Sequence, residues 1–173
     1  MTGVQTCALP IFYDEGLPFH PIHRVLFQAD EKTFLAELAA HGDCGIEEAS
    51  KAAAFAAVDE GAAEHRFAIL TAGGTRLVRF PRPKANLAAG TIQEFLDGYL
   101  ARHPGTGIDY IHGLESLEAL AAKPGNLGIY LPPIDKAGFF GTVIRDGVMP
   151  RKTFSMGEAP EKRFYIEARK ILP

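Results

Sequence analysis

Hydrophobic residues along the chain follow two different spacings, and each spacing predicts a different secondary structure. Short apolar or β-branched runs, bounded by glycine, proline or polar residues, predict strands. These runs are residues 21–27, 65–71, 76–80, 108–111, 127–131 and 163–171. The second and third runs lie on either side of Gly73-Gly74, a pair that favours a tight turn, so we expect them to form a hairpin.

Apolar residues three and four positions apart predict helices between the strands. The predicted helices run from Asp30 to Gly42, over residues 46–58, from Thr91 to Pro104, over residues 114–121, and after Asp135. Thr91 and Glu94 have the spacing of a capping box, in which both side chains bond free backbone N–H groups at a helix start. Glu47 and Lys51 are placed to form an ion pair within the 46–58 helix. The mixture of elements predicts an α+β fold, with helices packed on a mixed sheet.

The first eleven residues differ from the rest of the chain. They carry no charge and no periodicity, and they resemble a translated sequencing adapter more than a signal peptide, which would begin with basic residues. We therefore expect residues 1–11 to lie outside the fold and the native sequence to begin near Phe12. Residues 12–173 would then be the C-terminal portion of a single, truncated α+β domain. The missing N-terminal half of the same protein would be its natural partner.

Composition narrows the class of protein. The chain is 47% hydrophobic and 23% charged, as globular proteins are. No segment approaches the roughly 18 apolar residues that cross a bilayer, so no membrane association is expected. The net charge of −3 disfavours nucleic-acid binding, which usually needs a basic surplus. Of the two cysteines, Cys7 lies in the suspected adapter, and a single remaining Cys44 fits a reducing, cytoplasmic compartment.

The segment over residues 149–159 contains the densest group of chemically useful side chains. Arg151, Lys152, Thr153 and Ser155 gather two cations and two hydroxyls close to a glycine. Cations and backbone amides are what a phosphate or carboxylate group requires, so this segment is a candidate anion-binding loop. The alternative interpretation is a solvated loop that precedes the last strand.

Two further candidates lie in or beside predicted strands. His20 and His23 are three residues apart, and such residues face opposite sides of a strand, so no metal site is expected. His23 and Arg24 could each reach a ligand separately, although a histidine here could instead complete a hydrogen-bonded sheet edge. His112 follows Asp109 at a strand end and could be an oriented base, with a structural turn as the alternative. The sequence contains no phosphate-binding loop, dinucleotide fingerprint or nucleophile elbow, so its catalytic residues stay unknown.

Two sequence blocks resemble the domain of unknown function 1015 family. They are YDEGLPFHPIHRV at residues 13–25 and VMPRKTFSMGEA at residues 148–159, with further likeness at residues 108–113 and 123–131. In that family the first block follows an N-terminal half carrying an Asp-Gly-His/Asn-His motif, similar to a motif of ParB-like proteins and archaeal free-serine kinases. The resemblance implies a serine-related phosphotransferase, which would use a nucleotide with magnesium. This chain contains no such motif.

The sequence is therefore compatible with three classes of function. The first is part of an enzyme that phosphorylates free serine, in which Arg151, Lys152 and Thr153 contact the anion and His23 and Arg24 are secondary contacts. The second is a module that binds or senses a small ligand without catalysis. The third is a ParB-like nucleic-acid-associated protein, which the net charge disfavours.

Overall fold

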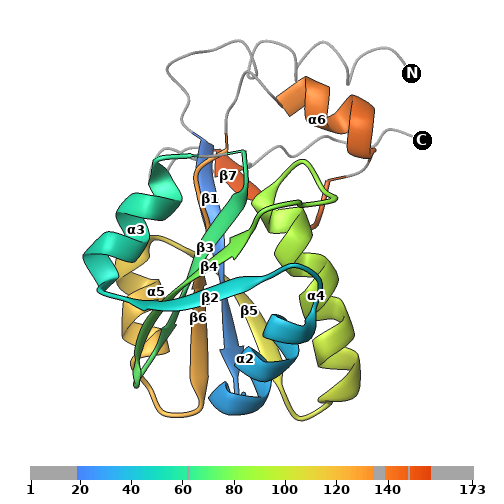
Figure 1. Cartoon of the computed structure of the whole chain (residues 1–173). Coiled ribbons are helices and arrows are strands. Elements are labelled where there is room, and N and C mark those ends of the chain that lie inside the picture. The colour runs from blue at the N-terminus through green and yellow to red at the C-terminus, as the bar shows by residue number, and fades with distance from the viewer. Residues whose placement is uncertain (1–18, 62, 135–138, 148, 157–173) are drawn as a thin grey trace, which may run out of the picture. The chain divides into compact units, whose positions relative to one another are not determined.

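A single sheet organises the part of the chain that the structure describes. The computed structural model describes residues 19–61, 63–134, 139–147 and 149–156. The strands are β1 (Phe19–Phe27), β2 (Gly45–Ala49), β3 (His65–Thr71), β4 (Gly74–Phe80), β5 (Gly107–His112), β6 (Asn126–Tyr130) and β7 (Phe154–Met156). They pair in the order β2-β4-β3-β6-β1-β5, and β7 pairs with β1 (Figure 1). Neighbouring strands along the path from β2 to β5 are antiparallel.

Helices cover both faces of the sheet. The helices on the two faces are α2 (Glu31–Ala40), α3 (Lys51–Asp59), α4 (Ala88–Arg102) and α5 (Leu114–Ala121), and a further helix is α6 (Phe139–Asp146). In Figure 1, α3 and α5 lie to the left of the strands and α4 lies to the right. The expected α+β fold with packed helices is confirmed, as are the hairpin, the strands at 21–27, 108–111 and 127–131, and the helix after Asp135.

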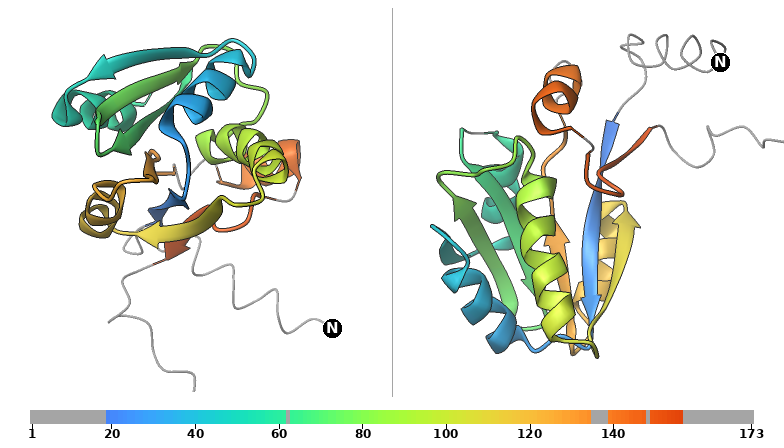
Figure 2. Two further views of the ribbon diagram at one scale, coloured as in Figure 1. Left: turned by 90° about the horizontal axis from the view of Figure 1, so that it is seen from below. Right: turned by 90° about the vertical axis from the view of Figure 1, so that its right-hand side faces the viewer.

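Two hydrophobic clusters form the core, one on each face of the sheet. On one face, Leu26 of β1 packs with Phe34 of α2 and Phe95 of α4. On the other face, Val25 packs with Ala54 of α3 and Leu117 of α5. Adjacent residues of β1 therefore enter different cores, as the alternation of side chains along a strand requires. The right-hand view of Figure 2 shows α4 running alongside the strands on its own face.

Local signals explain several element boundaries. Asp30 caps α2 as expected, because its side chain accepts a hydrogen bond from the Thr33 backbone N–H at 2.8 Å. The hairpin turns through Ala72 and Gly73, and Gly74, the first residue of β4, has a φ of 135° that L side chains rarely adopt. The Thr71 hydroxyl supports this turn by accepting from the Gly73 N–H at 3.1 Å.

The prediction of one helix over residues 46–58 is wrong. The segment divides at Ser50, with strand β2 before it and helix α3 after it. The exposed edge of β4 provides backbone partners for β2, and Ile46 packs against the core, so sheet pairing outweighs the helical preference of the segment. The expected Glu47–Lys51 pair does not form. Glu47 instead contacts Arg79 at 2.7 Å, and Lys51 contacts Glu118 at 3.0 Å.

The prediction that Thr91 caps a helix is also wrong. Helix α4 begins at Ala88, and Leu87 precedes it without a side-chain hydrogen bond. Thr91 is buried inside the first turns of the helix, where its hydroxyl lies 2.8 Å from Nδ1 of His65 on β3. The hydroxyl thus joins the helix to the sheet. The predictions for residues 1–11 and for a strand over residues 163–171 lie outside the described residues.

Candidate functional site

Strand β1 places the neighbouring residues His23 and Arg24 on opposite faces of the sheet. His23 faces α3 and α5. Its Nδ1 accepts a hydrogen bond from the Leu131 N–H at 3.1 Å, and its ring stacks on Tyr130 with centroids 4.7 Å apart. Burial, followed by the positive charge of Arg24, lowers the pKa of His23 to about 4. His23 is therefore neutral at neutral pH, and one of its ring nitrogens accepts from the backbone directly after β6, the neighbouring strand.

Arg24 lies on the other face, towards α4, and no part of its side chain is exposed. Its Nη1 donates to the carbonyl oxygen of Ile22. Its Nε and Nη2 atoms are buried and have no hydrogen-bond partner among the residues that the structure describes. Burial lowers the pKa of Arg24 to about 10, which leaves the guanidinium charged at neutral pH. A buried charge with unsatisfied N–H groups costs free energy, and an anion beside these N–H groups would offset that cost.

Tyr110 links Arg24 to Arg151. Tyr110 lies on β5, directly opposite Arg24, and its ring centre is 5.3 Å from the Arg24 guanidinium carbon. The Nε of Arg151 donates to the Tyr110 hydroxyl at 3.0 Å, and the Arg151 guanidinium carbon lies 5.8 Å from the same ring centre. Two cationic groups therefore flank one aromatic ring, an arrangement that favours a bound anion.

Helix α4 contributes two polar residues beside Arg151. Asp97 Oδ1 lies 3.9 Å from Arg151 Nη2, and it accepts from Gln93 Nε2 at 2.8 Å. The Arg151 and Asp97 side chains are 67% and 62% exposed, so the charge of Arg151 is only weakly compensated by this pair. Gln93 is buried, and its Oε1 has no hydrogen-bond partner within the described part of the chain.

The other predicted loop residues differ from Arg151 in their placement. Lys152 is exposed and has a φ of 54°, so the chain bends at this position. Thr153 is buried, and its hydroxyl donates to the Pro150 carbonyl oxygen within the same loop. Ser155 is half-buried in β7. Arg151 and Lys152 are thus the two exposed cations of the loop, whereas Thr153 holds the loop in shape.

His112 ends β5, directly before Gly113, whose φ of 89° turns the chain into α5. His112 pairs with Ile22 across the strands and so shares the face of Arg24. Its ring contacts His20 edge-on, with centroids 5.3 Å apart. Asp109 lies three residues earlier, on the opposite face, and its Oδ1 accepts from the Tyr110 N–H at 2.7 Å. Asp109 therefore supports the strand backbone and does not orient His112.

The arrangement brings together some predicted residues and separates others. Arg24 and Arg151 meet at Tyr110 on the α4 side, and His112 shares that face of the sheet, whereas His23 does not. Lys152 follows Arg151 in the loop and is exposed. Sequence reasoning missed Tyr110 and Asp97 as members of this cluster. Tyr110 is two residues from His112 on the same strand, a spacing that could have marked it.

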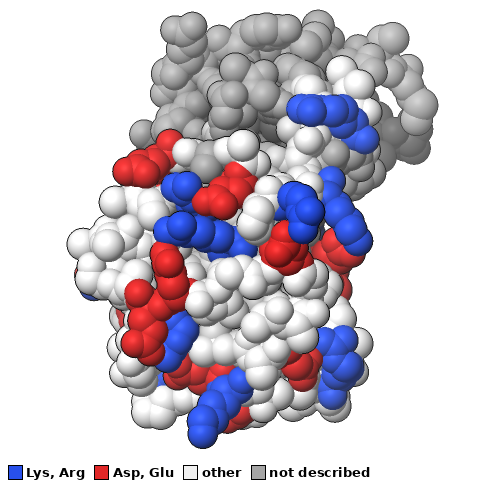
Figure 3. Space-filling view, in the orientation of Figure 1, with Lys and Arg blue, Asp and Glu red and all other residues white. Residues whose placement is uncertain are grey.

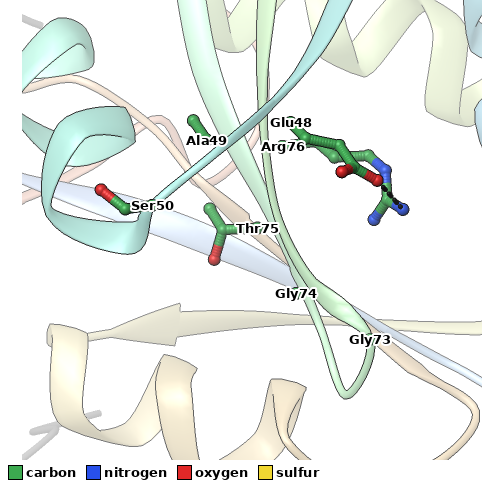
Figure 4. Close-up of a pocket in the computed structure, with 7 residues that line it drawn as sticks. All are labelled: Glu48, Ala49, Ser50, Gly73, Gly74, Thr75 and Arg76. Carbon is green, nitrogen blue, oxygen red and sulfur yellow. Dashed lines mark hydrogen bonds and ion pairs between the residues drawn. The ribbon is translucent and has the colours of Figure 1, made fainter.

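Pockets of the described structure also lie outside this cluster, and two of them have similar volumes. One has a volume of about 330 Å³ and is lined by residues of β2, the hairpin turn and the start of α3, including Glu48, Ser50 and Thr75 (Figure 4). Arg76 contacts Glu48, its partner on the neighbouring strand, at 3.3 Å. The other, of about 340 Å³, lies beside the start of α4 and has Pro150 in its lining. Pro150 directly precedes Arg151, so this second pocket adjoins the candidate anion site.

Charges of both signs alternate over the described surface in the view of Figure 3. None of the described helices has the length and apolar character needed to cross a membrane. The described residues also include no group of three histidine, cysteine or acidic side chains that could hold a metal ion.

Comparison with known proteins relates the fold to two solved structures. No protein-family profile and no curated protein sequence matches the chain. A conserved hypothetical protein from Pyrococcus furiosus is similar with a TM-score of 0.64 and 18% identity, over 84% of this chain and 58% of that one. A free serine kinase, solved as a point mutant in complex with AMP, is similar with a TM-score of 0.60 and 13% identity, over 84% of this chain and 56% of the kinase. The chain thus has the fold found in somewhat more than half of each of these proteins.

Proposed function

We propose that the chain forms the anion-binding part of a phosphotransferase that acts on free serine. The observation that carries the proposal is the buried guanidinium of Arg24 beside Tyr110 and Arg151, in a fold shared with a free serine kinase. Serine and its phosphorylated form both carry anionic groups. A fully buried cation and an exposed cation on one side of the sheet suit such a substrate.

The reaction needs positioning and charge neutralisation more than covalent participation of the protein. The serine hydroxyl oxygen forms a bond to the terminal phosphorus of a nucleotide, and the bond from that phosphorus to its bridging oxygen breaks. The hydroxyl proton passes to a base or to water. Phosphoserine and a nucleotide shortened by one phosphate result. Arg151 would orient the transferred group, and Arg24 would hold the amino acid in place.

The involvement of a nucleotide is supported by the AMP bound to the kinase of similar fold. Magnesium, which the sequence resemblance implies, supplies charge neutralisation at nucleotide phosphates.

Phosphoserine formation tests the proposal directly. The full chain is incubated with serine and either ADP or ATP, and phosphoserine is followed by phosphorus NMR, while calorimetry measures AMP binding. We expect AMP to bind to this chain, and phosphoserine to form once the chain is complemented by the rest of a full-length parent protein, because the chain matches only 56% of the similar kinase. Arg151→Gln should weaken binding of phosphorylated ligands by about tenfold or more, because a charge-assisted contact is worth roughly 1.5–3 kcal/mol. Arg82→Gln is the matched control, since Arg82 pairs with Asp43 on the exposed surface.

The second candidate is a module that binds a small anionic ligand without catalysis. It is favoured by His23, because this histidine is held on the face opposite Arg24 and is neutral, so it provides no base at the anion site. Phosphoserine binding by a folded chain, with neither phosphoserine formation nor AMP binding, would support this candidate and contradict the phosphotransferase.

A further inference from the structure

The two unsatisfied nitrogens of Arg24 belong to one edge of its guanidinium group. Nε–H and one Nη2–H point in parallel, and together they match the two oxygens of a carboxylate or phosphate group. Nη1, on the other edge, is already used by the Ile22 carbonyl. Within the described structure, the remaining edge is thus a two-pronged donor for one oxyanion, in a position where no atom of the side chain reaches solvent.

The charge of the position favours a carboxylate over a phosphate. A carboxylate carries one negative charge and can neutralise one buried guanidinium, whereas a phosphate monoester carries close to two at neutral pH. In the described structure, the further cation in contact with Tyr110 is the exposed residue Arg151, and the exposed Lys152 follows it in the loop, so both lie outside the buried position. A doubly charged phosphate is therefore more stable near the exposed cations, and a singly charged carboxylate is more stable beside the buried Arg24.

We propose that Arg24 binds the carboxylate of an α-amino acid, and that Arg151 with Lys152 faces the phosphoryl group on the same ligand. The identity of the ligand rests on the proposed function, whereas the preference for a carboxylate rests on Arg24. Because Arg24 is fully buried, binding requires a neighbouring side chain to move. The partly exposed ring of Tyr110, which lies over Arg24 and is hydrogen-bonded to Arg151, is that neighbour.

Two ligands that differ only in the carboxylate test this inference on the unaltered full chain. Calorimetry compares O-phosphoserine with O-phosphoethanolamine, which has the same phosphate and ammonium groups but no carboxylate. We expect phosphoserine to bind at least about tenfold more tightly, as one charge-assisted contact would give. Equal affinities for the two compounds, or weaker binding of phosphoserine, would overturn the inference without the need for any variant. Failure of both compounds to bind would overturn it as well.

Substitutions assign the preference to Arg24. Arg24→Lys keeps the positive charge but loses the two-pronged edge, so the ratio of the two affinities should fall towards one. Arg151→Lys should lower the affinities for both ligands and leave their ratio unchanged. The control Arg82→Lys should change neither affinity. An unchanged ratio in a folded Arg24→Lys protein would show that another residue binds the carboxylate. If Arg24→Lys lowered the affinities for inorganic phosphate, O-phosphoserine and O-phosphoethanolamine by the same factor, Arg24 would bind the phosphate group instead.

The outcome is separable from that of the proposed function. A carboxylate preference without phosphoserine formation would support Arg24 as an amino-acid contact and contradict the phosphotransferase. Phosphoserine formation with equal affinities for the two compounds would support the phosphotransferase and contradict the role of Arg24.

Discussion

His23 and Arg24 are neighbours in the sequence, yet the sheet separates them, and each has a different chemical state. His23 is neutral and accepts a hydrogen bond from the Leu131 backbone, while Arg24 is charged and has two unsatisfied donors in the described structure. The first residue therefore belongs to the packing of the α3 and α5 face, and the second belongs to the candidate site. Variants of the two residues should fail in different ways.

Replacement of His23 should change how stability depends on pH. The pKa of His23 is about 4 in the folded chain and ordinarily 6.5, so between these values the unfolded chain binds a proton that the folded chain does not. The free energy of unfolding must therefore decrease as the pH falls from 6.5 to 4. Asn in place of His23 can still accept from Leu131 but does not titrate. His23→Asn should reduce this decrease by as much as about 3 kcal/mol.

Urea denaturation at several pH values measures the effect, and His41→Asn, at a partly exposed helix end, is the matched control. A wild-type slope that persists in the His23→Asn protein would contradict the assignment of this titration to His23.

Removal of the Tyr110 hydroxyl should weaken the outer part of the site. Tyr110→Phe keeps the ring beside Arg24 but loses the acceptor for Arg151 Nε. Phosphorylated ligands should bind about threefold to tenfold more weakly, as expected for one hydrogen bond of roughly 0.5–1.5 kcal/mol. Calorimetry with O-phosphoserine measures the change, and Tyr99→Phe, whose ring is buried in the core against Phe34, is the control. A larger loss in the control would assign the effect to packing.

The charge of Lys152 can be tested without strain in the loop. Lys152 has a φ of 54°, a conformation that glycine adopts easily, so Lys152→Gly should leave the fold intact. Loss of the cation should lower the affinity for phosphorylated ligands. The loss should be smaller in high salt, because the side chain is exposed and salt screens its charge. The affinity for O-phosphoserine at low and high salt decides the matter. If the variant and the wild-type chain have the same affinity at both salt concentrations, Lys152 is part of a solvated loop and does not bind the ligand.

The boundary at Ser50 predicts a stability effect that a continuous 46–58 helix would not produce. Ser50 accepts from the Ala53 N–H at 3.3 Å and caps α3, so Ser50→Ala should lower the free energy of unfolding by about 1 kcal/mol. In a continuous helix the same change would be neutral or slightly stabilising, since alanine is the better helix former. Thermal and urea unfolding distinguish the two signs.

Gly128 should tolerate no side chain. A Cβ at this position of β6 would lie 2.8 Å from Ala121 Cβ and 3.2 Å from Leu117 Cδ1 on α5. Gly128→Ala should therefore destabilise the fold by roughly 1–3 kcal/mol through overpacking. Gly105→Ala is the control, because nothing lies within 4 Å of a Cβ there. Equal stability of the two variants in urea would mean that α5 can move away from the sheet without cost.

Much of the fold could be predicted from local patterns, because most elements carry their own boundary signals. Asp30 begins α2, Gly73-Gly74 makes the hairpin turn, and Pro104 follows α4. The failures at 46–58 and at Thr91 share a cause: the partner that decides each structure is distant in the sequence. Strand β2 depends on the edge of β4, and Thr91 depends on His65.

The candidate site was less predictable for a related reason. Residue type predicted Arg24, Arg151 and Lys152 as candidate anion-binding side chains, but the relation of Arg24 to Arg151 depends on Tyr110, which joins β5 to the loop. Alternation along β1 could separate His23 from Arg24 in advance. It could not indicate which face α4 would cover, because that choice depends on the packing of the whole sheet.

The strict alternation along β1 also limits how the length of this strand can change. One residue inserted or deleted within Phe19–Phe27 would carry the guanidinium under Tyr130 and the imidazole beside Tyr110, exchanging the two environments. Single substitutions change one face, whereas a change of length changes both at once. Among related sequences we therefore expect insertions and deletions to avoid β1 and to accumulate in longer connections such as residues 81–87 between β4 and α4, which belong to no strand.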